Sequence, residues 1–453
     1  MSSEWGKNLK LEISGRSHEE FISAVLTGLP KGISISEEEM HEFLKRRSPG
    51  TSNAVSGRRE EDKPLILGGI TGGKTDGSPL KIRIKNTNAE SGVYERLKTV
   101  PRPGHADYTA YIKWSGREDM RGGGKFSGRM TAPICAAGFA AIKFLEEQGI
   151  EITAHISSVG TIKDTPFNPL FISDGEKEAI KSNTIPVISE AAGEEMLSYI
   201  SNVKNQGDST GGTIECAITG LKPGIGDALF DGIESSLSSI IFAIPGVKGI
   251  EFGSGFSGSE NIGSVNNDPF IIKDGAVTCA SNNAGGILGG ISTGLPVVFK
   301  AAFKPTPSIA LEQKSVDLEA MEECTLNILG RHDPCIALRA APVIEACAAL
   351  SIMDLLLEDN NPATIEKCRE KIDRIDSRIL PLLAERFRVT DKIGELKAAH
   401  NLPVFNSDRE KAILENISAS ADKSCRADIA SIYMKIMQHS KARQNTAGNK
   451  KEN

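Results

Sequence analysis

Apolar and polar positions follow two different patterns along the chain. From residue 8 to about residue 357, short apolar runs alternate with glycine and proline. Residues 80–84 alternate between apolar and polar side chains, which predicts a strand. Residues 131–147, 227–241 and 343–357 place apolar side chains at helical spacing. We therefore expect mixed α and β structure in this part of the chain.

Beyond residue 358 the sequence changes to polar turn formers and then to long helical repeats. Residues 365–399 carry apolar side chains every three to four positions, which predicts one amphipathic helix with a local kink at Pro381. Further helices are expected near 407–418 and 425–445. The predicted organisation is an α+β domain at 1–358, a linker at 359–364, an all-α helical domain at 365–445 and a disordered tail at 446–453.

Composition narrows the class of protein. A chain of 453 residues is too long for one ordinary core, which agrees with two domains. Its formal net charge of −6 argues against a general nucleic-acid or membrane-surface binder. The eight cysteines form no Cys-x-x-Cys pair and no metal-ligand spacing, so we expect reduced thiols and no bound metal. Without an apolar run of membrane-spanning length or a signal sequence, a cytoplasmic protein is expected.

Two glycine-rich motifs match nucleotide-binding patterns without the context that those patterns require. Gly68-Gly-Ile-Thr-Gly-Gly-Lys-Thr75 has the letters of a P-loop, but a strand-like segment follows it instead of a helix. Gly253-Ser-Gly-Phe-Ser-Gly258 has the letters of a dinucleotide fingerprint, but no crossover helix follows. We therefore predict no nucleotide triphosphate at the first motif and interpret the second as a glycine-rich active-site loop.

The most informative segment joins a histidine, several cations and three consecutive glycines. It consists of Arg102-Pro-Gly-His-Ala-Asp-Tyr108 and Arg121-Gly-Gly-Gly-Lys-Phe-Ser-Gly-Arg129. Cations beside glycine-rich backbone favour an anionic ligand, and a histidine donates a proton near neutral pH. Related clusters are Ser14-Gly-Arg-Ser-His18, Asn282-Asn-Ala-Gly-Gly-Ile-Leu-Gly-Gly290, Lys304-Pro-Thr-Pro-Ser308 and Gly330-Arg-His-Asp-Pro-Cys335 with Arg339. In this order, from about residue 8 to 357, these blocks resemble the successive signatures of chorismate synthase.

The resemblance implies a fold, a reaction and a cofactor. The fold is a β-α-β sandwich, and the reaction is a 1,4-elimination of phosphate from 5-enolpyruvylshikimate 3-phosphate to give chorismate. The cofactor is reduced FMN, reduced by NADPH directly or through a separate reductase. Such a site must neutralise a phosphate and two carboxylates, protonate the departing phosphate and exclude water from the flavin.

The resemblance also assigns roles to individual residues. His18 matches the position that protonates the leaving phosphate, and His105 matches the position that protonates the reduced flavin. Asp333 matches the carboxylate that helps the flavin take up the substrate proton. Ser17 and Ser127 are expected to hydrogen-bond the partners of the two histidines or the flavin.

Charged and flavin-binding positions complete the expected synthase site. Guanidinium groups grip phosphate and carboxylate with two hydrogen bonds and keep their charge. The expected anion clamps are Arg47, Arg121, Arg129 and Arg339. The expected flavin contacts are Lys125, Phe126, Ser127, Gly289, Gly290, Lys304, Pro305, Thr306, Pro307, Ser308 and Arg331.

Four residues depart from the family pattern. Arg16 stands where a glutamate is usual, Glu19 where a glycine is usual, and Phe126 where a small residue is usual. Asn53 replaces an arginine that is sometimes linked to NADPH contact. These departures put in question the close approach of the backbone near His18 and the contact with the reductant.

Charged positions of the C-terminal part follow a second family pattern. They are Arg369-Glu-Lys-Ile-Asp, Leu382-Leu-Ala-Glu-Arg386, Lys397, Asp408-Arg-Glu410 and Ser440-x-x-x-Gln444. This pattern resembles the all-helical class of chorismate mutase, which rearranges chorismate to prephenate. Asn406 replaces the usual aspartate, whose contact is with a substrate hydroxyl.

Helical spacing adds a constraint on this second site. Arg386 and Lys397 are about three turns apart on one helix face, roughly 16 Å, so their long side chains can converge on a small ligand. Arg369 lies about 25 Å along the same helix from Arg386, too far for one ligand to bridge. We therefore expect Arg369 to enter the site of a partner subunit, which makes a domain-swapped dimer a hypothesis.

The rearrangement is unimolecular and needs no nucleophile. Clamping the two carboxylates and placing donors on the ether oxygen lower its barrier. We assign the carboxylates to Arg386 and the partner's Arg369, and the ether oxygen to Lys397 and Gln444. Supporting contacts are assigned to Arg409, Glu410, Ser440 and Asn406.

The sequence thus predicts a bifunctional shikimate-pathway enzyme in which the product of the first domain is the substrate of the second. A homo-oligomer is expected, with a tetrameric synthase core as in relatives and a dimeric mutase domain. Small anionic molecules are the expected ligands, without nucleic-acid or membrane partners. One alternative makes the C-terminal domain a non-catalytic sensor of chorismate or an aromatic amino acid. Another makes the whole chain a phosphate-binding protein without turnover.

Overall fold

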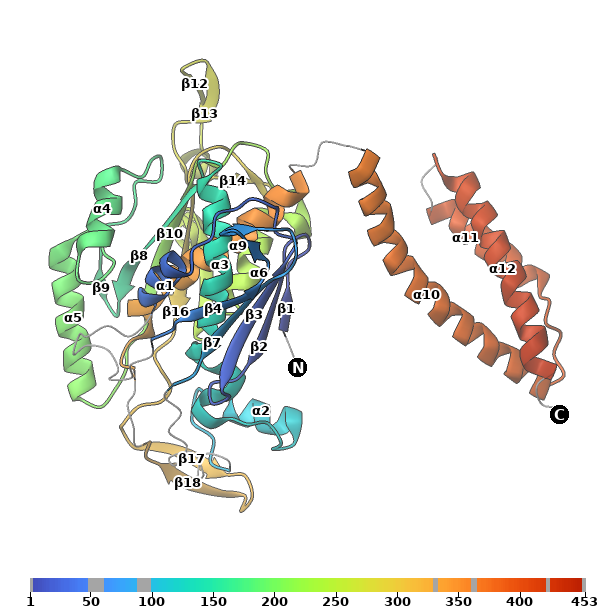
Figure 1. Cartoon of the computed structure of the whole chain (residues 1–453), viewed down its shortest axis with the longest axis horizontal. Coiled ribbons are helices and arrows are strands. Elements are labelled where there is room, and N and C mark those ends of the chain that lie inside the picture. The colour runs from blue at the N-terminus through green and yellow to red at the C-terminus, as the bar shows by residue number, and fades with distance from the viewer. Residues whose placement is uncertain are drawn as a thin grey trace. The chain divides into compact units, whose positions relative to one another are not determined.

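A computed structural model describes residues 3–47, 61–87, 99–328, 333–359, 365–420 and 424–449. The chain divides into two compact units, Met1–Asn360 and Asn361–Asn453, and each is described by itself (Figure 1).

The first unit contains two antiparallel five-stranded sheets. The first sheet has the order β1-β2-β3-β7-β4 and the second the order β11-β16-β10-β8-β9. The strands of the first are β1 (Ser3–Trp5), β2 (Lys10–Gly15), β3 (Phe21–Thr27), β7 (Leu80–Lys85) and β4 (Pro64–Gly68). Those of the second are β11 (Val247–Phe252), β16 (Val297–Phe303), β10 (Gly212–Thr219), β8 (Glu151–Val159) and β9 (Ile162–Lys163).

Helices fill the space between the two sheets. They are α1 (Glu37–Lys45), α3 (Thr131–Glu146), α6 (Ile233–Ile241) and α9 (Ala341–Asp359) (Figure 1). Helix α3 is apolar on every face and buried over most of its length, as a helix between two sheets must be. It meets α9 at Gly138, where an added Cβ would lie 2.7 Å from the Cα of Ala346. The predicted β-α-β sandwich is confirmed.

Smaller elements surround this sandwich. Helices α4 (Asp174–Ser182) and α5 (Glu190–Asn205) lie beside the second sheet, on the side away from α3 and α9 (Figure 1). The remaining helices are α2 (Asp107–Trp114), α7 (Gly255–Gly258) and α8 (Gly263–Asn266). Short hairpins are β5 (Ile70–Thr71) with β6 (Lys74–Thr75), β12 (Phe270–Lys273) with β13 (Ala276–Cys279), β14 (Ile287–Leu288) with β15 (Ile291–Ser292), and β17 (Gln313–Asp317) with β18 (Glu322–Leu326). The 3₁₀ turns are Arg121–Phe126, Gly128–Met130, Leu229–Asp231 and Ile336–Arg339.

The start of the chain is tied to the last helix of this unit. A carboxylate of α9, Asp354, accepts hydrogen bonds from the backbone N–H groups of Lys7, Asn8 and Leu9 at 3.1, 2.7 and 2.7 Å. These bonds satisfy three backbone donors that precede β2.

A buried histidine links the middle strands of the second sheet. The ring of His155 on β8 lies 2.9 Å from Glu215 on β10 and 2.9 Å from Asp164. Burial lowers the pKa of His155, but its hydrogen bonds with the two carboxylates outweigh this and raise it above the ordinary value. The edge of His155 also packs on Phe167, with ring centroids 4.5 Å apart.

Most predicted elements of the first unit are found. Residues 80–84 lie in β7 and 343–357 in α9, and the helix expected at 131–147 is α3, which ends one residue earlier, at Glu146. The helix expected at 227–241 was wrong in its first part, where a 3₁₀ turn precedes α6 because Leu229 has a positive φ of 62° and Gly232 is extended. The P-loop-like motif forms the β5–β6 hairpin without a following helix. The second glycine motif leads into α7, a four-residue helix that is too short for a crossover.

The second unit is all-helical. It consists of α10 (Ile365–Ala399), α11 (Ser407–Ser420) and α12 (Arg426–Asn449), and α10 runs through Pro381 as one curved helix (Figure 1). Helix α12 includes residues 446–449, so the expectation of a disordered tail there was wrong. No proline interrupts the helix before Gly448. Of the predicted linker, Asp359 belongs to α9, and the rest lies outside the described residues.

Candidate active sites

A glycine loop forms the centre of the first site. The segment Arg121–Phe126 precedes α3 and contains three consecutive glycines with positive φ: Gly122 at 60°, Gly123 at 90° and Gly124 at 54°. Residues with a Cβ rarely adopt this conformation, so the loop requires glycine.

The two predicted histidines pack against consecutive glycines of this loop. His18 lies on the turn between β2 and β3, and Ser17 donates its backbone N–H to Gly124 O at 3.3 Å. An added Cβ on Gly122 would lie 2.7 Å from Ser17 Oγ and closer still to the His18 ring. An added Cβ on Gly123 would lie 3.4 Å from His105 Nε2. Residues far apart in the sequence therefore place the two imidazoles on neighbouring positions of one loop.

A buried ion pair fixes the orientation of His105. Its Nδ1 lies 2.7 Å from Asp107 Oδ1, and Arg102 donates to both carboxylate oxygens of Asp107 at 2.7 and 2.8 Å. Burial tends to raise the pKa of Asp107, but the hydrogen bonds and charges of Arg102 and His105 bring it well below its ordinary value. The ionised carboxylate holds the Nδ1 edge of the ring, so the Nε2 edge faces Gly123.

A cavity of about 470 Å³ opens beside His105. Its walls come from the His105 segment, the glycine loop, the segment after α6 and the segment after β16. The lining includes Arg102, His105, Gly122, Lys125, Phe126, Ser127, Lys248, Lys304, Pro305, Thr306, Pro307 and Ser308. His18 does not line this cavity but packs behind Gly122, which does.

Several groups at this cavity favour an anionic, polar ligand. Lys304 donates to the backbone oxygen of Gly104, and burial together with Lys248 lowers its pKa below the ordinary value. The buried Thr306 Oγ1 has no hydrogen-bond partner among the described residues. A buried hydroxyl without a partner is costly unless a ligand or water supplies one.

Lys125 belongs to a second charged cluster on the rim of this cavity. Glu118 Oε1 lies 3.4 Å from Lys125 Nζ and 3.0 Å from Arg16 Nε, and the Glu118 side chain is largely buried. Lys125 also lines a neighbouring polar cavity of about 610 Å³, whose other lining residues come from β2, β3, the turn between them and β7. Arg16, one of the departures from the family pattern, therefore contacts the same carboxylate as a predicted flavin ligand.

The predicted anion clamps are engaged with carboxylates of the chain. Arg47 and Arg129 both pair with Asp62, and all three side chains are buried. The two arginines outweigh the effect of burial and lower the pKa of Asp62. Arg121 pairs with Asp119 at 2.7 Å. None of these three arginines lines the 470 Å³ cavity, so their contact with substrate stays a prediction.

The remaining predicted residues lie at the edge of this region or outside it. Arg339 pairs with Asp333, whose second carboxylate oxygen is buried without a partner among the described residues. Gly289 and Gly290 form the turn between β14 and β15 and do not line the cavity. Arg331 and Asn53 lie outside the described residues.

Sequence reasoning missed the two acids that organise the site, Asp62 and Asp107. Asp107 could have been predicted, because it lies two residues after His105 in the motif quoted above. Asp62 carries no local signal, since its partners Arg47 and Arg129 are 15 and 67 residues away.

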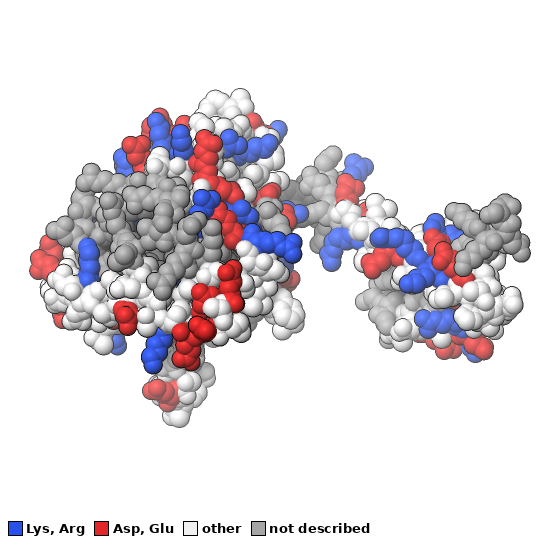
Figure 2. Space-filling view, turned by 90° about the horizontal axis from the view of Figure 1, so that it is seen from below, with Lys and Arg blue, Asp and Glu red and all other residues white. Residues whose placement is uncertain are grey.

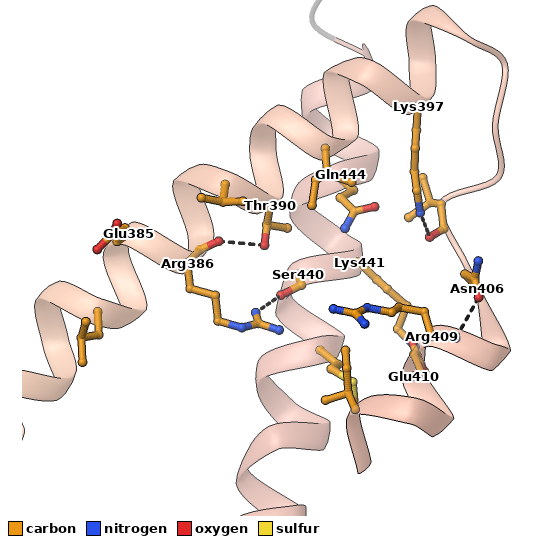
Figure 3. A pocket seen from close by; sticks show the side chains of 16 residues that line it. Glu385, Arg386, Thr390, Lys397, Asn406, Arg409, Glu410, Ser440, Lys441 and Gln444 are labelled. Carbon is orange, nitrogen blue, oxygen red and sulfur yellow. Dashed lines mark hydrogen bonds and ion pairs between the residues drawn. The ribbon is translucent and has the colours of Figure 1, made fainter. Parts of the chain in front are cut away.

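The second unit contains a cavity of about 660 Å³ among its three helices (Figure 3). Seven of the predicted mutase residues line it: Arg386, Lys397, Asn406, Arg409, Glu410, Ser440 and Gln444. Arg369 does not, and its side chain is exposed on α10.

Internal hydrogen bonds orient the cations of this cavity. Arg386 donates to Ser440 Oγ at 2.7 Å, and Ser440 donates in turn to Ile436 O at 2.8 Å. Lys397 donates to Val404 O at 2.7 Å (Figure 3). The guanidinium of Arg409 points into the space between α10 and α12 (Figure 3). Arginine and lysine donors on one cavity suit a ligand with two carboxylates.

Two further features of this cavity were not predicted. Asn406 acts as an N-cap of α11, because its Oδ1 accepts from Arg409 N–H at 2.9 Å. Lys441 lines the cavity and pairs with Glu410 at 3.0 Å. Because Lys441 directly follows Ser440 in the sequence, its place at the cavity could have been predicted.

On the face seen in Figure 2, basic and acidic side chains of the described residues are interspersed over both units. Among the described residues, no helix is long and apolar enough to cross a membrane. The described part of the chain also contains no cluster of three or more His, Cys, Asp or Glu side chains that could hold a metal ion.

Comparison with known proteins identifies a family for each of the two units. The chorismate synthase family matches residues 9–357, and the chorismate mutase type II family matches residues 368–445. Chorismate synthases of Pyrococcus abyssi and Thermococcus kodakarensis are 44% and 43% identical over 78% of this chain and 97% of their own lengths. A crystal structure of chorismate synthase covers 83% of this chain and 99% of its own, with a TM-score of 0.63 and 26% identity. The chain therefore belongs to the chorismate synthase family and carries a chorismate mutase type II domain at its C-terminal end.

Proposed function

We propose that the first unit eliminates phosphate from 5-enolpyruvylshikimate 3-phosphate with the help of reduced FMN, and that the second unit converts the resulting chorismate to prephenate. The observation that carries the first half is the pair of imidazoles on Gly122 and Gly123 beside a cation-lined cavity. The observation that carries the second half is the convergence of seven predicted residues on one cavity.

The residues of the first cavity fit FMN. Lys304 and Lys248 supply positive charge for a phosphate, and Thr306 Oγ1 offers an unused hydrogen-bonding group. Gly122 and Gly123 leave room for the His18 and His105 side chains to pack against the loop, which keeps both imidazoles close to the cavity. When bound, reduced FMN supplies an electron-rich ring that promotes loss of the phosphate.

The chain's own groups then manage charge and protons. Asp107 fixes the Nδ1 edge of His105, so Nε2, which faces Gly123, is the atom through which His105 would deliver a proton to bound FMN. His18 is the donor for the leaving phosphate. Asp333, whose buried Oδ1 has no hydrogen-bond partner among the described residues and whose other oxygen pairs with Arg339, would assist removal of the substrate's proton.

An anaerobic assay with the substrate, FMN and NADPH, without added reductase, tests the first half. Chorismate formation under these conditions means intrinsic flavin reduction, and formation only with dithionite means an external electron source. His105→Ala should keep FMN binding and lose most of the elimination rate. An unchanged rate in this variant would refute a catalytic role for His105, and no chorismate from the wild-type chain under either condition would favour a phosphate-binding protein without turnover.

The second cavity is proposed to bind chorismate by its carboxylates. Arg386 takes one carboxylate, and Lys397 and Gln444 donate to the ether oxygen, where negative charge develops. Glu410, Arg409, Ser440 and Asn406 make the supporting contacts. Adding chorismate to the full chain without flavin and following its absorbance tests this half. No loss above the uncatalysed rate would favour the alternative, a sensor of chorismate or an aromatic amino acid.

The second carboxylate is proposed to meet Arg369 of a partner subunit. Within one chain, α10 exposes apolar side chains along its length, among them Ile372, Leu382 and Leu396, which a second copy could cover. Mixing Arg369→Ala and Arg386→Ala chains after subunit exchange should restore roughly a quarter of wild-type mutase activity, since one heterodimer site keeps both arginines. No recovery, with exchange verified by mass, would refute a shared site.

A further inference from the structure

Gly394 is an unusual residue for the interior of α10, which ends five residues later at Ala399. Glycine in a helix interior costs about 1 kcal/mol relative to alanine, and nothing about the turn requires it here. The reason for the glycine must therefore lie in what packs against it.

The backbone of α12 occupies the place of the missing side chain. A Cβ added to Gly394 would lie 2.8 Å from Gln444 Cα, 2.9 Å from its backbone oxygen and 3.3 Å from its carbonyl carbon. These are backbone atoms, so no side-chain rotation could relieve the clash. Restoring ordinary van der Waals contact requires α12 to retreat by about 0.6 Å or more.

The contact lies where the chemistry of the second cavity is concentrated. Gln444 lines the cavity, and its Oε1 is buried without a hydrogen-bond partner among the described residues (Figure 3). Lys397 follows Gly394 by one turn of the same helix and lines the same cavity. The distance between α10 and α12 at Gly394 thus sets the distance between the two donors.

We propose that Gly394 is a positioning residue that holds Gln444 within reach of the ligand of Lys397. This inference rests on the proposed mutase function. A ligand group misplaced by about 1 Å loses up to 10²-fold in rate. Arg386 and Ser440, which are proposed to contact the substrate, lie one turn or more from Gly394 and Gln444. Their position should be affected less.

The test uses the full chain with chorismate and no flavin, so that the first unit contributes nothing. In Gly394→Ala, kcat should fall about tenfold or more while KM changes less than threefold. Alanine strengthens a helix, so this loss cannot come from a weaker α10. The matched control is Glu395→Ala, which introduces alanine at the neighbouring, exposed position of α10. This variant should leave kcat unchanged.

A double variant separates positioning of Gln444 from a general packing effect. If Gly394 acts through Gln444, Gly394→Ala in a Gln444→Ala background should cost nothing further. Multiplied losses in the double variant, a kcat of Gly394→Ala within twofold of wild type, or loss of helical circular dichroism would each overturn the proposal. A wild-type chain that leaves chorismate untouched would overturn the proposed function instead.

Discussion

Replacing Gly122 by alanine tests whether the glycine loop positions His18. The residue has a φ of 60°, and an added Cβ would collide with the His18 ring and lie 2.7 Å from Ser17 Oγ. The backbone conformation alone costs a residue with a Cβ about 1–2 kcal/mol. The imidazole must in addition move by about 1 Å or more to restore ordinary contact.

We expect a large loss of elimination rate and a modest loss of folding stability. We expect Gly122→Ala to lower the free energy of unfolding by about 2 kcal/mol and the elimination rate by about 10²-fold, because the proton donor is displaced. Chorismate formation with dithionite-reduced FMN measures the rate, and urea denaturation measures the stability.

Gly72 supplies the matched control for backbone strain. Its φ is also 60°, but an added Cβ there would meet nothing within 4 Å. Gly72→Ala should therefore cost about 1–2 kcal/mol of stability and leave elimination unchanged. If Gly122→Ala keeps more than a third of the wild-type rate, the loop does not position His18, and the reasoning fails.

Two further predictions concern buried and capping groups. His155→Gln removes the imidazolium between Asp164 and Glu215 and should destabilise the first unit by about 3 kcal/mol near pH 6. Because the native pKa of His155 is raised, its stabilisation is complete below its unfolded pKa of about 6.5 and is lost as the pH rises through the native value. The difference in Tm between wild type and variant should therefore shrink with rising pH, and a constant difference would contradict the charged state. Asn406→Asp keeps the oxygen that caps α11, so stability should change by less than about 0.5 kcal/mol, while chorismate turnover should rise severalfold through a stronger hydroxyl contact. An unchanged or lower kcat/KM would show that Asn406 does not contact the ligand.

The spacing and length of apolar runs were enough to predict several helices and a strand. They identified β7, α3, α9 and the three helices of the second unit. They failed at Leu229, whose positive φ precedes a close contact between Gly232 and Gly290, 58 residues further along the chain and invisible to any local pattern.

The functional sites were likewise predicted where local spacing is sufficient and missed where distant segments pack together. Motif spacing brought together the mutase residues because most of them lie on helices with regular geometry. It did not reveal that Asp62 sits between Arg47 and Arg129, because that arrangement depends on how distant segments pack. Nor did it explain Gly394, whose role depends on the neighbouring helix.

The hydrogen bonds from Lys7, Asn8 and Leu9 to Asp354 have a consequence for biosynthesis. Ribosomes add about 5–20 residues per second, so the N-terminal strands wait tens of seconds for the segment that completes them. During that time α3 and the strands β8 and β10 lack the helix α9, which packs against them in the complete unit. Nascent chains should accordingly depend on chaperones until residue 354 has emerged, and N-terminal fragments that end before α9 should be prone to aggregate.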